Sequence, residues 1–377
     1  MQVSALSRLS LFVCFVLLSV PPLRADEPPP LLDRIDRSSF TVSGLSSGAA
    51  MAVQIGVAHS SRVGGVGIVS GPPYLCAQGF VTRATNDCLV LGRERLRELF
   101  GPLFGLSLFS SGERDIDTED LVADTRKMAR QRRIDPVDGI ARQRVWEYRG
   151  EKDGVVGTKA SLAQHDFYRS LGARTKRAAP RATPHTMPTG DPTQGACDST
   201  DEDFVSGCDF DAAGELLRHL RRKPSARAEE TDGQWYALNQ ADFVPSGPTD
   251  ADATRRALGL AESARVFVPR RCTEERCQIH VALHGCKQGM NDASYRAFTE
   301  GAGYPRWAGP LKLVLLFPRV RAIEPFERGP WDSIGNPLGC WDWWGYTTPG
   351  NLYGYATREA PQMRTIVNMV DHLMRSH

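Results

Sequence analysis

Residues 43–50, SGLSSGAA, contain the pattern G-x-S-x-G with Ser46 at its centre. In a nucleophile elbow this pattern forms a sharp turn between a strand and a helix, and the turn lifts the serine oxygen clear of the backbone. Residues 40–42 are predicted to form the strand, and the good helix formers of residues 49–54 predict the helix. The pattern alone is short and common, so a catalytic serine also requires a base and an acid elsewhere in the chain.

An acid and a histidine follow the serine in the order serine, acid, histidine, which is the order in α/β-hydrolases. Asp153 follows a strand-like run in RGEKDGVV, and His185 lies in the loop TPHTMPTGD. An aspartate before glycine is also a common turn residue, and that reading of Asp153 stays open on the pattern alone. His280 alternates with the interior of a predicted strand, so we expect it in the core.

The segment VALHGCKQG, residues 281–289, resembles the loop that donates a backbone N–H to the oxyanion in α/β-hydrolases. In that fold the loop normally precedes the nucleophile, whereas here it follows the candidate serine, acid and histidine in the sequence. A circular permutation accounts for this order. The predicted fold class is therefore α/β, a circularly permuted α/β-hydrolase fold with a mostly parallel central sheet flanked by helices. The predicted oxyanion donors are the backbone N–H groups of Ser47 and Cys286, with His284 as a structural hydrogen-bonding residue nearby.

The remaining pattern predicts one catalytic domain over residues 26–377. Apolar runs at 63–69, 265–272, 277–286 and 311–320 are typical of buried strands. Residues 89–142 indicate a helical insertion, and the polar stretch at about 224–247 indicates a possible linker or insertion.

The first 25 residues are typical of a secretory signal. Arg8 provides the positive region, an apolar run of about a dozen residues follows, and small residues permit cleavage after Ala25. The run is shorter than the roughly 20 residues that a membrane-spanning helix needs. We therefore expect a secreted protein, extracellular or periplasmic, with no membrane association after cleavage.

Export makes disulfides the expected state of the cysteines. One of the 9 cysteines, Cys14, lies in the predicted signal, and the others form an even set. The simplest sequential pairing is one of about 105 connectivities. It joins Cys76 to Cys88, Cys197 to Cys208, Cys272 to Cys277, and Cys286 to Cys340. No C-x-x-C pair suggests a zinc site, so no metal and no cofactor are expected.

Composition argues against a nucleic-acid partner. The formal net charge is only +2, and 24% of residues are charged. A protein that binds through phosphate contacts usually carries a strongly basic domain. Oligomeric state is left open by the sequence.

The chain resembles the polyhydroxybutyrate depolymerases, in particular their circularly permuted extracellular type. The matching stretches are GLSSGAAMA, GEKDGVV, PHTMPT followed by two cysteines, CDFDAAGELL, VALHGCKQG and GCWDWWGY. They extend over nearly the whole mature chain in one order. The resemblance implies that Ser46 is the nucleophile, Asp153 and His185 are its partners, and Ser47 and Cys286 are the oxyanion donors.

The resemblance also implies a substrate, a polyester of short 3-hydroxyacids cleaved through an acyl-enzyme. Such a chain calls for apolar subsites, and the candidate residues are Trp307, Trp341, Trp343 and Trp344. Some of these tryptophans could instead belong to the core. Alternative functions are a general carboxylesterase of the feruloyl or acetyl-xylan type, a 3-hydroxybutyrate oligomer hydrolase, and an inactive hydrolase-like binding protein.

Overall fold

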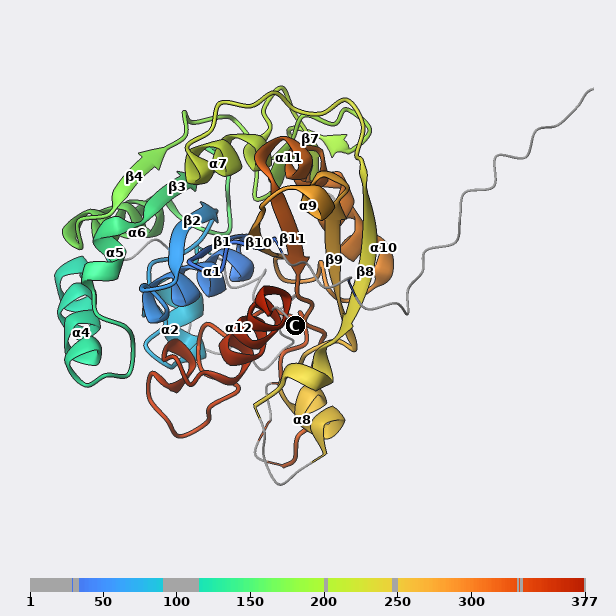
Figure 1. Cartoon of the computed structure of the whole chain (residues 1–377). Helices are drawn as coiled ribbons and strands as arrows, with labels where there is room; N and C mark the ends of the chain where they lie inside the picture. Colours follow the sequence, from blue (N-terminus) through green and yellow to red (C-terminus); the bar gives the residue numbers. More distant parts are fainter. Residues whose placement is uncertain are drawn as a thin grey trace, which may run out of the picture.

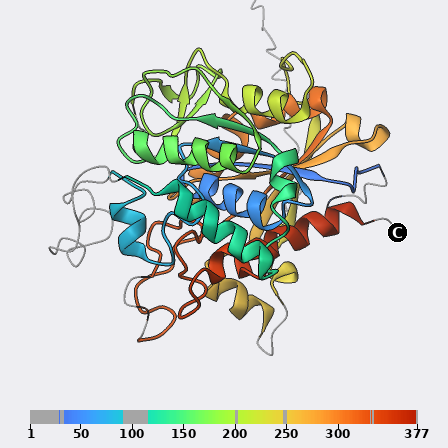
Figure 2. The same ribbon diagram turned by 90° about the vertical axis from the view of Figure 1, so that its left-hand side faces the viewer.

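The fold is built on an eight-stranded sheet with helices on both faces (Figures 1 and 2). The structure, a computed structural model, describes residues 29, 34–90, 115–199, 203–245, 250–330, 332 and 335–375. The sheet order is β4-β3-β2-β1-β10-β11-β9-β8. Its strands are β1 (Phe40–Leu45), β2 (Val63–Val69), β3 (Arg144–Tyr148), β4 (Arg174–Arg177), β8 (Gly233–Asn239), β9 (Ser263–Pro269), β10 (Gln278–Leu283) and β11 (Leu313–Phe317).

Adjacent strands from β4 to β11 in this order are parallel, and β9 is antiparallel to both of its neighbours. The central strands β1, β10 and β11 are buried along their whole length, as expected for strands covered on both faces. The edge strand β4 has the sequence RTKR, and its exposed charges discourage pairing with another chain. A smaller sheet contains β5 (Met187–Thr189), β7 (Val205–Gly207) and β6 (Gly195–Ala196).

Two hydrophobic clusters cover the two faces of the sheet. One contains buried residues of α1, α4, α6 and α12, and the other contains buried residues of α7 and α11. The helices are α1 (Ser47–Ala58), α2 (Val81–Asn86), α4 (Thr118–Arg130), α5 (Asp138–Arg142), α6 (Thr158–Ser170), α7 (Ala212–Arg221), α8 (Ala251–Ala257), α9 (Arg271–Glu274), α10 (Asp292–Arg296), α11 (Tyr304–Leu311) and α12 (Pro361–Met374), with short turns at Gln240–Phe243, Ala297–Gly301 and Gly354–Ala356.

The permuted strand order is visible at the centre of the sheet. β1, the first strand in the chain, pairs with β2 on one side and with β10 on the other, where Thr41 lies opposite His280. The first four strands thus form one half of the sheet, and the four strands from β8 to β11 form the other half. The predicted fold class is confirmed, including the displacement of the strand that carries the HGC loop to the later part of the chain.

Within the possible linker or insertion predicted at about 224–247, residues 233–239 form the edge strand β8. The aromatic ring of Trp235 lies 5.0 Å from Phe267 and 5.7 Å from Phe317. This packing holds a polar stretch in an extended conformation. In the predicted helical insertion, α4 and α5 are helical, while residues 91–114 lie outside the described part of the chain.

Four disulfides join the eight cysteines of the predicted mature chain in the sequential order. They are Cys76–Cys88, Cys197–Cys208, Cys272–Cys277 and Cys286–Cys340. The last spans 54 residues and joins the HGC loop after β10 to the segment GCWDWWGY. Four disulfides are consistent with an oxidising compartment. Among the described residues, no helix is long and apolar enough to cross a membrane.

Candidate active site

Ser46 occupies the turn between β1 and α1 in a strained conformation. Its φ is 57° and its ψ is −120°, a combination that side-chain-bearing residues rarely adopt. A Cβ atom on Gly44 would lie 2.3 Å from the carbonyl carbon of Gly48, and one on Gly48 would lie 2.2 Å from the carbonyl oxygen of Leu283. The turn can therefore be this tight only because both flanking residues are glycine.

His185 and Asp153 form a buried hydrogen-bonded pair, in which His185 Nδ1 lies 2.9 Å from Asp153 Oδ2. The second carboxylate oxygen of Asp153 accepts the backbone N–H groups of Val155 and Val156 at 2.8 and 3.0 Å. Burial alone would raise the pKa of Asp153, but His185 and these hydrogen bonds lower it below its ordinary value. An ionised Asp153 holds the Nδ1 proton on His185 and leaves Nε2 free to accept a proton.

Two other histidines near the sheet centre belong to the core. His280 is fully buried between Thr41 Oγ1 and Ser43 Oγ, each 2.8 Å from a ring nitrogen, and burial lowers its pKa to about 3. His284 Nε2 accepts the backbone N–H of Val320 at 3.1 Å, and burial lowers its pKa to about 4. Both are neutral structural residues at physiological pH, as the sequence predicted.

The HGC loop lies directly beside Ser46. A Cβ atom on Gly285 would lie 3.3 Å from Ser46 Cβ, and the Gly285 N–H donates to Gln288 Oε1 at 2.6 Å. The N–H of Ser47 is the first of α1 and has no acceptor within the helix. The structure therefore places Ser47 and Cys286, the two residues predicted to supply oxyanion donors, in one cleft with Ser46.

Ser46, Ser47, His185 and Cys286 line one cleft, and most of its other walls are apolar. The sequence analysis missed several of the apolar wall residues, namely Val81, Leu89, Val155, Val156, Phe204 and Leu338. Val155 and Val156 directly follow Asp153, so their proximity to the site could have been inferred. The other four reach the cleft through long-range contacts that leave no local pattern.

Only two of the four candidate tryptophans line the cleft, Trp343 and Trp344. Trp341 is fully buried behind the cleft, and its indole N–H donates to the His284 carbonyl at 3.0 Å. Trp307 does not line this cleft, and it is buried in the hydrophobic cluster that contains α7 and α11. Its indole N–H donates to Asp211 at 2.8 Å, and the ring lies against Gly214 of α7.

The tryptophan wall is held from behind by a dense polar network. The Asp342 carboxylate accepts the backbone N–H groups of Gly345, Tyr346 and Thr347 at 2.7, 3.0 and 2.9 Å. The Tyr346 ring lies 5.0 Å from the Trp344 ring. These contacts give the loop that carries Trp343 and Trp344 a fixed shape.

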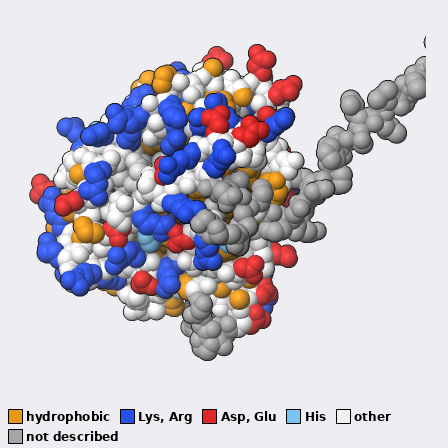
Figure 3. Space-filling view, viewed as in Figure 1, with side chains coloured by type: hydrophobic (Ala, Val, Ile, Leu, Met, Phe, Trp, Pro, Cys, Tyr) orange, Lys and Arg blue, Asp and Glu red, His pale blue; other side chains and the backbone are white. Residues whose placement is uncertain are grey.

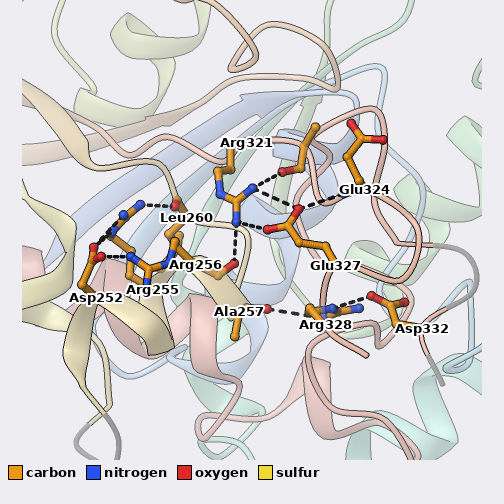
Figure 4. Close-up of polar contacts among 11 residues, drawn as sticks. Asp252, Arg255, Arg256, Ala257, Leu260, Arg321, Glu324, Glu327, Arg328 and Asp332 are labelled. Carbon is orange, nitrogen blue, oxygen red and sulfur yellow. Dashed lines mark hydrogen bonds and ion pairs between the residues drawn. The ribbon is translucent and has the colours of Figure 1, made fainter. Parts of the chain in front are cut away.

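Arg328 connects this loop to its surroundings. It donates to the Tyr346 carbonyl at 2.8 Å and forms a 2.7 Å ion pair with Asp332, and its guanidinium also reaches the Ala257 carbonyl at the end of α8. Figure 4 shows Arg328 next to a second group, in which Arg321 binds Glu327 and the carbonyl of Arg256. Two arginines thus fasten the segment that precedes the tryptophan loop to α8.

The described residues contain no cluster of His, Cys, Asp or Glu side chains suited to a metal ion. A strained serine after the central strand of a mostly parallel sheet, with a His–Asp pair and an HGC loop beside it, defines a protein of the α/β-hydrolase class.

Comparison with known proteins narrows this class. No family model matches the chain. It is 32% identical to the poly(3-hydroxybutyrate) depolymerase of Delftia acidovorans over 348 residues, which cover 90% of this chain and 60% of that protein. It is 27% identical to the polyhydroxybutyrate depolymerase of Talaromyces funiculosus over 326 residues, which cover 83% of this chain and 84% of that protein. The chain thus spans about three fifths of the Delftia protein's length.

Solved structures agree with the sequence comparison. The crystal structure of a PHB depolymerase from Penicillium funiculosum matches with a TM-score of 0.71 and 25% identity, covering 90% of this chain and 96% of that one. A PHB depolymerase complexed with an R3HB trimer has the same fold, with a TM-score of 0.71, 24% identity and the same coverage. In sequence and in fold, the chain is therefore similar to polyhydroxybutyrate depolymerases.

Proposed function

We propose that this protein is a serine esterase that hydrolyses the ester bonds of poly(3-hydroxybutyrate) or a similar short-chain polyhydroxyalkanoate. The proposal rests on the His185–Asp153 pair and Ser46 in one cleft with mostly apolar walls. An apolar cleft with a few converging polar groups suits an uncharged polyester chain. Sequence similarity supports the substrate class, since both relatives are named as depolymerases of this polymer.

In the proposed mechanism, Ser46 Oγ attacks the ester carbonyl while His185 Nε2 takes its proton. Asp153 keeps the other ring nitrogen protonated and stabilises the imidazolium. The N–H groups of Ser47 and Cys286 bind the oxyanion, and His185 protonates the departing alkoxide. Water then hydrolyses the acyl-enzyme with His185 again acting as the base. Loss of one oxyanion donor typically costs about 2.7–4 kcal/mol of transition-state stabilisation.

Trp343 and Trp344 are the residues that we propose to contact the polymer chain. Both line the cleft and are almost fully buried in the unliganded protein, at 7% and 9% exposure. Flat aromatic surfaces pack well against the methyl groups and backbone of such a chain. Trp341 would act indirectly, because it supports the HGC loop through its bond to the His284 carbonyl.

The test is clearing of a poly(3-hydroxybutyrate) suspension by the purified protein and by Ser46→Ala, with a short-chain p-nitrophenyl ester assayed in parallel. We expect the wild type to clear the suspension and to cleave the soluble ester, and Ser46→Ala to do neither. Cleavage of the soluble ester without clearing would show that the polymer is not the substrate. The protein would then be a general esterase or an oligomer hydrolase. Full activity of Ser46→Ala would show that Ser46 is not the nucleophile.

We also propose that the protein is exported, with residues 1–25 removed as a signal. The four disulfides support an oxidising destination. Mass spectrometry of protein recovered from the periplasm or the medium should give an N-terminus at Asp26. A recovered chain that retains residues 1–25 would contradict the proposal.

A further inference from the structure

A second concave site lies where the C-terminal end of α7 meets strands β3 and β4. It has a volume of about 360 Å³, and its charged and titratable lining residues are Lys176, Glu215, Arg218, His219, Arg222 and Lys223. Arg144 and Arg174 lie beside it at the amino ends of β3 and β4. Ser46 and Asp153 follow the carboxyl ends of β1 and β3, so this basic cleft lies at the opposite end of the strands from the catalytic cleft.

Positive charge gathers in this region. Figure 3 shows Lys and Arg side chains concentrated over β4 and α7, in the upper left of the view. Four of the six residues named in the basic cleft are cationic at neutral pH, and only Glu215 is anionic. The whole chain has a formal net charge of only +2, so the basic cleft is a local excess and does not reflect the average composition.

The cations of the basic cleft lack direct ion-pair partners in the part of the chain that the structure describes. Within the described residues, Lys176, Arg218, Arg222 and Lys223 form no ion pair. Arg218 is held by other means, through a 3.2 Å bond from Nε to the Gly214 carbonyl and a position 5.1 Å above the Trp307 ring. Its guanidinium is therefore held in place without an ion pair among the described residues.

Several of these cations repel one another. Burial lowers the pKa of Arg144, and the neighbouring Arg222 and Arg174 lower it further. Burial together with Arg144 and Lys176 lowers the pKa of His219 to about 4, so His219 is neutral at physiological pH. Bringing cations this close costs free energy, which an anion between them would recover.

Helix geometry does not account for the whole cluster. The C-terminal end of a helix carries about half a negative charge, which favours a cation such as Arg218 or Arg222. Charges on an edge strand also discourage aggregation, which suits Lys176. Neither effect requires four cations from two elements to line the same cleft, with Arg144 and Arg174 beside them.

We propose that the basic cleft binds a phosphate group as a dianion, at a site separate from the catalytic cleft. Arginine guanidinium groups offer paired N–H donors that match phosphate oxygens, and lysine adds a mobile point charge. Glu215 opposes the ligand and limits its affinity. The phosphate could belong to a soluble molecule or to a lipid headgroup, and both would use the same contacts.

The test is calorimetric titration of the mature protein with sodium pyrophosphate at low ionic strength. We expect saturable binding that Lys176→Gln combined with Lys223→Gln weakens by at least about tenfold. Glu215→Gln should tighten binding, because it removes the opposing charge. The matched control is Arg130→Gln, an exposed arginine of α4, which packs against α6 and contributes to the other face of the sheet, and which should leave the affinity unchanged.

Co-sedimentation with phosphatidic acid vesicles identifies the source of the phosphate. Binding to vesicles alone would assign the basic cleft to a lipid headgroup, and binding to pyrophosphate would assign it to a soluble ligand. Binding to neither would overturn the proposal. Equal weakening of pyrophosphate binding by Arg130→Gln and by the double variant would also overturn the proposal. That result would mean that binding depends on the net charge of the protein and not on the basic cleft. None of these readouts depends on esterase activity.

Discussion

At the scale of single residues, both oxygens of the Asp153 carboxylate are held by hydrogen bonds, and only one of them faces the proposed catalytic histidine. One of its oxygens accepts two backbone N–H groups, while the other faces His185 Nδ1. The two oxygens therefore have different and fixed roles. Any substitute at this position must present an acceptor to the backbone before it can face the imidazole.

This constraint gives a sharp prediction for Asp153→Asn. The Asn oxygen must take the position facing Val155 and Val156, so its NH₂ group faces His185 Nδ1. His185 then accepts at Nδ1 and carries its proton on Nε2, where it cannot act as a base. We expect kcat to fall on the order of 10⁴-fold with little change in thermal stability. Ester hydrolysis by the variant, beside the exposed control Asp166→Asn, checks this, and a loss below tenfold would reject Asp153 as the acid.

Glu147 provides a second prediction at this scale, on stability. It is buried on β3 with Oε2 2.8 Å from His165 Nδ1, and burial raises its pKa from 4.5 to about 8. The folded state thus keeps a proton that the unfolded chain loses above about pH 4.5. This contribution to stability is complete at lower pH and is lost as pH rises toward 8.

Relative to Glu147→Gln, the wild type should therefore lose up to about 1.4 kcal/mol of unfolding free energy per pH unit between pH 5 and 8. Urea unfolding of both proteins at several pH values measures this difference. Glu151→Gln, at an exposed position nearby, is the control and should follow the wild-type profile. Parallel profiles for the wild type and Glu147→Gln would mean that Glu147 titrates normally.

At the scale of elements, the Cys286–Cys340 disulfide joins the two loops that enclose Ser46. It ties the HGC loop after β10 to the segment that carries the cleft tryptophans. Cys286 contributes to the proposed oxyanion hole through its backbone, so serine at this position keeps the donor and removes only the restraint. The covalent bond and the donor can therefore be separated by experiment.

We expect Cys286→Ser combined with Cys340→Ser to lower kcat by about tenfold or more, with a smaller change in KM, because the oxyanion donor is less well positioned. The control is Cys272→Ser combined with Cys277→Ser, which opens a disulfide at the amino end of β10, away from the cleft. That control should lower thermal stability and keep kcat. An equal loss of kcat in both double variants would mean that the effect comes from general destabilisation of the fold and not from the Cys286–Cys340 disulfide in particular.

At the scale of the whole molecule, the order of the motifs was enough to predict the permuted fold and the groups around Ser46. These groups could be predicted because each follows a strand or opens a helix, and carboxyl ends of parallel strands converge. The tryptophans could not be assigned in the same way. Trp307 and Trp343 differ in their long-range neighbours, Asp211 for one and the catalytic cleft for the other, and no local pattern encodes that difference.

The same limit explains β8 and the basic cleft. An edge strand at 233–239 needs the aromatic surface of β9 and β11, which comes later in the chain. The arginines at the end of α7 are ordinary for a helix terminus until β4 places Lys176 in the same cleft. Contacts between distant segments decide both features.

The pairing of β1 with β10 also determines when the site around Ser46 can form. Thr41 and His280 are hydrogen-bonded across the sheet centre although they are 239 residues apart in sequence. Contacts of such long range form slowly, because much of the chain must be ordered first. Ser46 is synthesised well before the HGC loop, so a partly synthesised chain has this serine without the loop that lies beside it in the folded protein. The surroundings of Ser46 are therefore completed only after both halves of the sheet have formed and paired.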